Sequence, residues 1–162
     1  MMSLNWDDKA LMRKFDALET KVARAAIRKG VRAGRKTTLA VAKTNAAGLR
    51  KSGTGMSEKI RSALKLRVTP KSTLHRKDSY AMEVLIDPKI TPEFLHVTKE
   101  GKKYYIPYAI EYGHAAPGDG GSKDKFVLPK PFMIPAHEMT RNTSIYMASR
   151  VIADEIKKAW NR

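Results

Sequence analysis

The chain has 162 residues, of which 42% are hydrophobic, and 32 Lys and Arg against 16 Asp and Glu give it a formal net charge of +16. This size predicts a single domain over residues 1–162 with one core. The absence of cysteine excludes disulfides and thiolate metal sites, and no apolar run approaches the ~18 residues of a membrane span. The N-terminus lacks the basic start and apolar centre of a signal peptide. The absence of cysteine is compatible with a cytoplasmic origin, and we expect no membrane partner.

The first stretch of the chain predicts a long helix. Apolar residues recur at steps of three and four and form one helical face, namely Leu11, Phe15, Leu18, Val22 and Ala26. Asn5 or Asp7 is in position to cap this helix, which we expect to begin near Trp6. Further along, Gly30 and Gly34 predict a bend or break, because each costs about 1 kcal/mol in a helix interior.

The positive charge is concentrated in a basic helical region, residues 24–67, which contains thirteen basic residues and one acid, Glu58. Five of the cations follow helical spacing on one face and form a stripe: Arg24, Arg28, Arg32, Arg35 and Lys36. Such a field favours a polyanion, nucleic acid first and an acidic protein surface second. The alternative is a solubilising helix face.

Residues 46–55 are rich in Gly, Ser and Lys and should end the long helix. The apolar spacing over residues 56–64 then predicts a short helix. Thr54 or Ser57 is the expected cap of this short helix.

Alternation of apolar and polar residues predicts strands over residues 64–68 and 80–86. Residues 94–98 and 103–107 flank a glycine-containing connection of hairpin length. We therefore expect one small antiparallel sheet of three or four strands.

Residues 104–136 hold four of the six tyrosines. Prolines at positions 107, 129, 131 and 135 fix the backbone on both sides of residues 114–125, which predicts two rigid segments joined by a mobile loop over residues 114–125. Glu111 stands in an otherwise apolar segment, where a buried carboxylate costs several kcal/mol unless paired. Two interpretations are open: Glu111 faces solvent, or it reaches an arginine or lysine of a neighbouring copy.

A last helix is expected from Pro135-Ala136 onward. Its predicted apolar face consists of Ile145, Ala148, Ile152, Ile156 and Ala159 or Trp160. With this helix packed on the sheet, the order of helix, small sheet and helix predicts an α+β fold.

The four histidines, His75, His96, His114 and His137, show no zinc-motif spacing, and no nucleotide or hydrolase fingerprint is present. Glu111 and His114 would lie together only if their segment is one helical turn, and such a pair is usually a surface contact. We therefore predict no catalytic, metal or cofactor site.

Three segments, in order, resemble the tail-completion and head-tail joining proteins of long-tailed bacteriophages and prophages, often described as minor tail or neck proteins. Thr54-Gly55-Met56 followed by Ile60 is similar to the family's threonine-glycine turn before its first strand. Residues 108–113, Tyr-Ala-Ile-Glu-Tyr-Gly, resemble its tyrosine-alanine, glutamate-aromatic-glycine segment. Residues 131–136, Pro-Phe-Met-Ile-Pro-Ala, resemble its entry to the C-terminal helix. The proline that commonly precedes the family's turn is absent here.

The resemblance implies a structural virion protein that forms a ring, usually of six copies, at the head-proximal end of the tail and joins the tail tube to the connector. It implies no enzyme activity and no small-molecule substrate. A closed ring needs two different patches per subunit, and the expected interface residues are Tyr105, Tyr108, Glu111, Tyr112, Phe132 and Met133. The basic stripe would face packaged DNA in the lumen or an acidic surface of the neighbouring ring.

Two other functions compete with this interpretation. The first is a free nucleic-acid-binding module that uses the basic helix for nonspecific contact. The second is a small nuclease or toxin, for which Glu111, His114 and nearby lysines are the only plausible acid-base groups.

Overall fold

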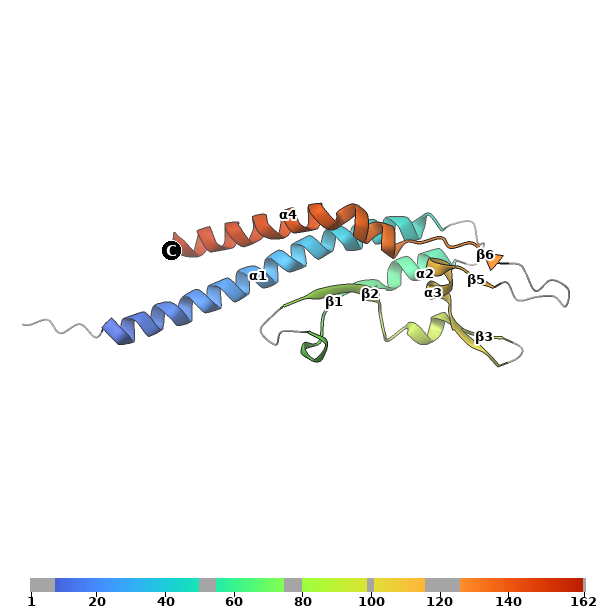
Figure 1. Ribbon diagram of the computed structural model, residues 1–162, viewed down its shortest axis with the longest axis horizontal. Coiled ribbons are helices and arrows are strands. Elements are labelled where there is room, and N and C mark those ends of the chain that lie inside the picture. Colours follow the sequence, from blue (N-terminus) through green and yellow to red (C-terminus); the bar gives the residue numbers. More distant parts are fainter. Residues whose placement is uncertain (1–7, 50–54, 75–79, 99–100, 116–125, 162) are drawn as a thin grey trace, which may run out of the picture.

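The computed structural model describes residues 8–49, 55–74, 80–98, 101–115 and 126–161, and for residues 8–20 and Trp160 it describes the backbone alone. Within them the architecture is α+β. Helix α1 (Asp8–Ala47) and helix α4 (Met133–Trp160) lie side by side and antiparallel, with the sheets and short helices along α1 and at one end of the pair (Figure 1). At 1.5 Å per residue α1 is about 60 Å long. Its first turns extend past the end of α4 (Figure 1).

Helix α1 is continuous through Gly30 and Gly34, so the expected bend or break there is wrong. Both glycines are buried where α1 meets α4. A Cβ atom at Gly34 would lie 2.4 Å from the carbonyl oxygen of Ser144, and one at Gly30 would lie 2.5 Å from Cγ1 of Ile152. The glycines let the two helices approach closely, and this packing offsets their low helix propensity.

The contact between the long helices is a seam of small side chains. Every fourth residue of α1 contributes to it, and all six are buried: Ala26, Gly30, Gly34, Thr38, Ala42 and Ala46. The matching positions of α4 are Ala136, Thr140, Ser144, Ala148 and Ile152. Inside the seam, Thr38 Oγ1 lies 2.8 Å from Thr140 Oγ1 and 3.1 Å from Ser144 Oγ. The buried hydroxyls therefore satisfy one another, as buried polar groups must.

Helix α4 packs on α1 and not on a sheet, so the expected packing of the C-terminal helix is wrong. It begins at Met133, slightly before the expected start. Of its predicted apolar face, Ala148 and Ile152 lie in the seam, whereas Ile145 and Ile156 are exposed. The small residues bring the helix axes close together, which leaves larger side chains beside the contact instead of inside it.

The strands form three separate two-stranded antiparallel sheets in the described residues, so the expected single sheet of three or four strands is wrong. Strand β1 (Leu64–Val68) pairs with β2 (Met82–Ile86), which confirms the two strands expected there. Strand β3 (Leu95–Val97) pairs with β4 (Lys103–Tyr105), which confirms the expected hairpin. The third pair, β5 (His114–Ala115) with β6 (Phe126–Val127), was not expected. Strand β4 runs directly into a helix, which separates the second hairpin from the third.

Short helices connect these strands. They are α2 (Met56–Ala63), η2 (Lys71–Thr73), η3 (Thr91–Phe94) and α3 (Ile106–Tyr112). Helix α2 confirms the predicted short helix, but its cap is Gly55 in the left-handed region (φ 65°), without a side-chain hydrogen bond from Ser57. Thr54 lies outside the described residues, as do Asn5, Trp6 and Asp7 at the expected start of α1, which here begins at Asp8.

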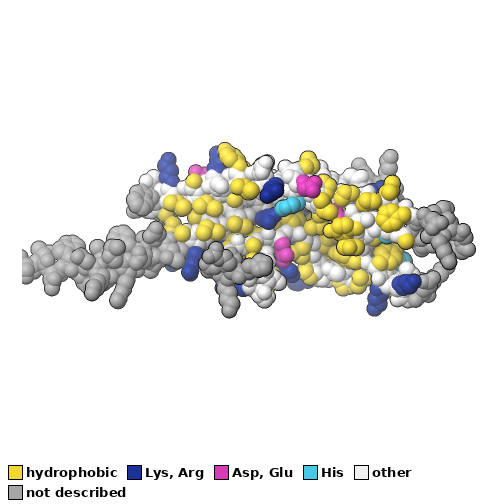
Figure 2. Space-filling model, viewed as in Figure 1, with side chains coloured by type: hydrophobic (Ala, Val, Ile, Leu, Met, Phe, Trp, Pro, Cys, Tyr) yellow, Lys and Arg dark blue, Asp and Glu magenta, His cyan; other side chains and the backbone are white. Residues whose placement is uncertain are grey.

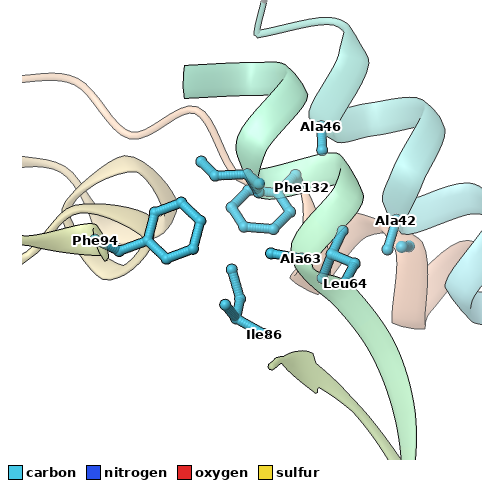
Figure 3. Packing of buried hydrophobic residues seen from close by; sticks show 9 residues of the cluster. Ala42, Ala46, Ala63, Leu64, Ile86, Phe94 and Phe132 are labelled. Atoms are coloured by element: carbon cyan, nitrogen blue, oxygen red, sulfur yellow. The ribbon is translucent and has the colours of Figure 1, made fainter. Parts of the chain in front are cut away.

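The core lies where the end of α1 meets α2, the first hairpin and the start of α4 (Figure 3). Phe94 and Phe132 are its largest side chains, and Ile60 and Leu64 complete its centre. One end of the helix pair is thus anchored in the core. No helix in the described part of the chain is long and apolar enough to cross a membrane.

Candidate functional site

Glu111 joins two segments that lie 21 residues apart in the chain. Its side chain is buried, and its oxygens accept hydrogen bonds from the first backbone N–H groups of α4: Phe132 N at 2.9 Å from Oε2, Met133 N at 3.1 Å from Oε2, and Ile134 N at 2.8 Å from Oε1. Nearby, the Lys130 N–H donates to the Ile110 carbonyl at 2.8 Å. Helix α3 is therefore fastened to the start of α4.

Neither sequence interpretation of Glu111 describes this arrangement. The carboxylate is 6% exposed, so it does not face solvent, and its partners are backbone amides of its own chain, not a cation of another copy. The N-terminus of a helix offers unpaired N–H groups and a positive dipole end, both of which favour a carboxylate. The sequence does hold one indication of this role. Phe132, the N-cap residue of α4, has a side chain that cannot accept a hydrogen bond, so the first amides of α4 need an acceptor from elsewhere.

Large apolar side chains are exposed beside this joint. Tyr108 and Tyr112 lie on the outside of α3 at 63% and 52% exposure, with ring centroids 4.5 Å apart. The Phe126 ring lies against Gly113, next to them. We define the apolar face as Tyr108, Tyr112, Phe126, Val127, Leu128 and Ile134, all exposed. Hydrophobic side chains gather at this end of the molecule, with a few Lys and Arg side chains at its edge (Figure 2). Several large apolar side chains exposed on neighbouring elements are typical of an interaction site.

The other predicted interface residues lie inside the fold. Phe132 is in the core, and Met133 packs against it. Tyr105 is half-buried with its ring edge-on to Phe94, at a centroid distance of 6.4 Å. Burial raises the pKa of the Tyr105 hydroxyl, and the opposing hydrogen bond with Thr91 has the smaller effect. Of the six residues expected at a subunit interface, Tyr108 and Tyr112 are the exposed ones.

Four cations of the predicted stripe follow one another at every fourth position of α1, and all are exposed. We call Arg24, Arg28, Arg32 and Lys36 the basic line. It is two residues out of phase with the seam, so it lies on the side of α1 opposite α4. The guanidinium of Arg28 lies 5.8 Å from the centroid of the Tyr80 ring. Arg35 does not belong to this line. It lies one residue after Gly34 of the seam and lines a groove between α1 and α4.

Glu111 and His114, the acid-base groups of the enzyme alternative, each contact other partners. Helix α3 ends at Tyr112, and His114 begins β5, with Nδ1 3.4 Å from the Ala109 carbonyl oxygen and its ring stacked on Tyr104. Both oxygens of Glu111 are occupied by backbone amides. Among the described residues, no group of three or more His, Asp or Glu is placed to hold a metal ion. Residues 116–125 of the predicted loop lie outside the described residues.

No known protein family, curated protein or solved structure matches this chain.

Proposed function

We propose that this chain is a structural virion protein that forms a ring at the head-proximal end of a phage tail and joins it to the head connector. One observation supports the proposal most directly. Two of the three segments that carry the family resemblance, residues 108–113 and 131–136, meet in space through the hydrogen bonds of Glu111. The residues of the third segment also have structural roles, with Gly55 at the cap of α2 and Ile60 in the core.

The apolar face fits the role of a subunit contact. A ring requires two different patches on each subunit, so the apolar face would meet a different surface of the next copy. Exposed apolar residues of α4, such as Met139, Ile145 and Tyr146, provide a candidate for that second surface. The basic line would then face the packaged DNA or an acidic surface of the adjoining ring, holding phosphates through contacts that do not depend on sequence.

The proposal is tested on intact particles purified from the strain that carries the gene. Mass spectrometry should detect this polypeptide in them at a copy number similar to that of the connector protein. Its presence at that stoichiometry supports the ring, and electron microscopy of the neck should then show density for it next to the connector. Its absence from the particles, with the protein free in the lysate, rejects the proposal.

The basic line favours a second candidate, a nonspecific nucleic-acid-binding module. Four cations at every fourth position of one exposed helix side would follow a phosphate backbone without reading bases. The two candidates differ in salt dependence. Duplex binding by the isolated protein that persists above ~0.3 M salt favours the module, whereas a purely phosphate-driven guide should release DNA as counterions compete.

A further inference from the structure

Helix α4 has a second uncharged side besides the seam. Exposed residues follow one another there at alternating steps of three and four, and we call them the outer stripe: Met139, Asn142, Tyr146, Ser149, Ala153 and Ile156. A helix side that faces only water normally carries charged residues. Although 30% of this chain is charged, no position of the outer stripe is. Alternating steps of three and four are instead typical of two helices that pack side by side.

The outer stripe lies on the side of α4 away from α1. Tyr146 follows Ser144 of the seam by two residues, which is about 200° around the helix. The sheets lie along α1, so this side of α4 faces away from them (Figure 1). Ile145, which is also exposed, extends the stripe toward the groove that it lines with Val31 and Ala148. Within the described part of the chain, nothing covers the outer stripe.

The sizes of the side chains along the stripe suit a second copy of the same helix that runs antiparallel. A two-fold axis at the middle of the stripe would bring together three kinds of facing pair: Tyr146 with Ser149, Asn142 with Ala153, and Met139 with Ile156. The two pairs nearest the axis each combine a larger with a smaller side chain, so the layers have similar volumes. A parallel pair would set Tyr146 against Tyr146 and Ser149 against Ser149, which overpacks one layer and leaves a void in the next.

The polar groups near the axis are compatible with this packing. Ser149 Oγ donates a hydrogen bond to the Ile145 carbonyl of its own helix at 3.0 Å, so its hydroxyl keeps a partner beneath an opposing ring. Arg150 flanks the stripe next to Ser149. In the antiparallel arrangement it would face Thr143 of the second copy, so the two Arg150 side chains would not oppose each other directly.

We propose that a second copy of this chain docks on the outer stripe, with the two α4 helices antiparallel. From Met139 to Ile156 the overlap is about 27 Å long at 1.5 Å per residue, and a helix is about 10 Å wide. Such a strip is smaller than the roughly 800 Å² per partner of a stable interface, so the pair should form reversibly and dissociate on dilution.

The inference does not depend on the virion role. A two-fold contact uses the same surface on both copies and closes at two, so it differs from a ring contact. Met139, Ile145 and Tyr146 are also the candidate second surface of the ring. The antiparallel pair would therefore compete with ring assembly for the same side of α4.

Because the chain has no cysteine, introduced cysteines can report the register of the pair. Under mild oxidation, a mixture of Asn142→Cys and Ala153→Cys proteins should form disulfide-linked dimers, since these positions face each other. Each variant alone should cross-link at least about tenfold more slowly, because like positions would lie about 16 Å apart along the axis, beyond the reach of a disulfide. An exposed control in η2, Lys71→Cys, measures random collision.

Two results of the cross-linking would overturn the proposal. Fast cross-linking of each variant with itself would mean a parallel contact. A mixture that cross-links no faster than the Lys71→Cys control would mean that the two helices meet only by collision.

A second measurement tests the pair in solution without cross-linking. Tyr146→Glu should raise the dissociation constant of the pair at least about tenfold, because both copies lose a ring near the axis. Sedimentation equilibrium measures this constant and separates a pair from a larger ring by mass. The matched control is Val97→Glu in β3, which is exposed and belongs neither to α4 nor to the apolar face.

Unchanged circular dichroism shows that both variants fold. Equal weakening in the two variants would reject the outer stripe as the contact. A wild-type chain that stays monomeric at about 1 mM would reject the pair itself.

Discussion

At the residue level, Glu111 caps a helix to which it does not belong. A local cap residue satisfies one or two of the first N–H groups of its own helix. Glu111 instead satisfies three of them from α3, and it is buried while doing so. Desolvation of a carboxylate is repaid only when its oxygens are well bonded. Glu111 therefore holds α3 against the start of α4.

We predict that Glu111→Ala lowers the free energy of unfolding by about 3 kcal/mol, because three backbone amides, one buried and two partly buried, lose their acceptor. Glu111→Gln should cost less, about 1–2 kcal/mol, since one oxygen remains while the new NH₂ group faces other donors. Urea unfolding monitored by circular dichroism measures both. Glu138→Gln, an exposed acid on α4, is the control and should stay within about 0.5 kcal/mol of wild type. A Glu111→Ala protein as stable as that control would contradict the capping role.

At the element level, the pairing of α1 with α4 depends on small residues. Large apolar side chains usually hold helices 8–10 Å apart. Here glycine, alanine and serine positions let the backbone of α4 approach so closely that a single methyl group at Gly34 would meet a carbonyl oxygen. Stability in this region therefore comes from contact density along the seam and not from bulky side chains.

We predict that Gly34→Ala destabilises the protein by about 1–3 kcal/mol through overpacking. On an open helix surface the same change stabilises by about 1 kcal/mol, because alanine is the better helix former. The sign of the change in thermal stability therefore decides between a packed and an open position. A stabilised Gly34→Ala protein would show that the helices do not meet there in solution.

An ion pair links β1 of the first hairpin to the residue that follows β2. Lys65 in β1 forms an ion pair with Asp87 at the end of β2, and the hydrogen bond from Lys65 lowers the pKa of Asp87 below its usual 3.8. A carboxyl with a lower pKa when folded contributes stability above its unfolded pKa of about 3.9. This contribution is lost as the pH falls through the folded pKa.

Asp87→Asn should therefore be less stable than wild type at pH 7, and the difference should narrow below pH 4 and vanish at lower pH. Urea midpoints measured between pH 7 and pH 2 test this. Asparagine can still accept the hydrogen bond that Lys89 N donates at 3.1 Å, so the turn is retained. Glu93→Gln, at an exposed acid, should show no such trend. A constant difference at all pH values would show that charge plays no part.

At the level of the whole molecule, the core, the apolar face and the basic line occupy different places. The core and the elements that carry the apolar face lie at one end of the helix pair (Figure 1). The basic line follows the side of α1 away from α4, where Arg28 lies beside Tyr80. An assembly through the apolar face would leave the basic line accessible to a polyanion.

We predict that Tyr108→Asp with Tyr112→Asp abolishes self-assembly or incorporation into particles without unfolding the chain, because exposed residues contribute little to the core. Mass photometry and particle composition measure assembly, and thermal melting measures folding. The matched control is Val97→Asp in β3, which is 52% exposed, like Tyr112, and belongs neither to the apolar face nor to the exposed apolar residues of α4. Assembly that survives the double change would remove the apolar face from the interface.

We also predict that replacing all four residues of the basic line by glutamine weakens duplex DNA binding uniformly across sequences. Each lost phosphate contact should reduce the slope of log affinity against log salt by about 0.9. The control replaces four other exposed lysines, Lys71, Lys89, Lys103 and Lys130, and so removes the same net charge. Equal effects in both proteins would mean that net charge, and not the line, attracts DNA.

Much of the local structure follows from the sequence. The long first helix, the short helix before the first strand, and the hairpins around residues 64–86 and 95–105 were all expected from apolar period and turn residues. The basic line also follows, since Arg24, Arg28, Arg32 and Lys36 share one side of any helix. Each of these features depends on spacing within one continuous segment, which a sequence records directly.

The remaining features depend on residues far apart in the chain. Gly34 alone predicts a break, and only the packing of Ser144 against it explains why the helix continues. The partners of Glu111 are amides of α4, far along the chain. Arg35 lines a groove whose other wall is α4. The sequence by itself determined the two long helices, the short helix α2, the strands of the first two sheets and where the charge lies, but not α3 or the third pair of strands. Only the tertiary structure decided how they pair, because close approach and the bonding of a buried carboxylate are properties of two segments together.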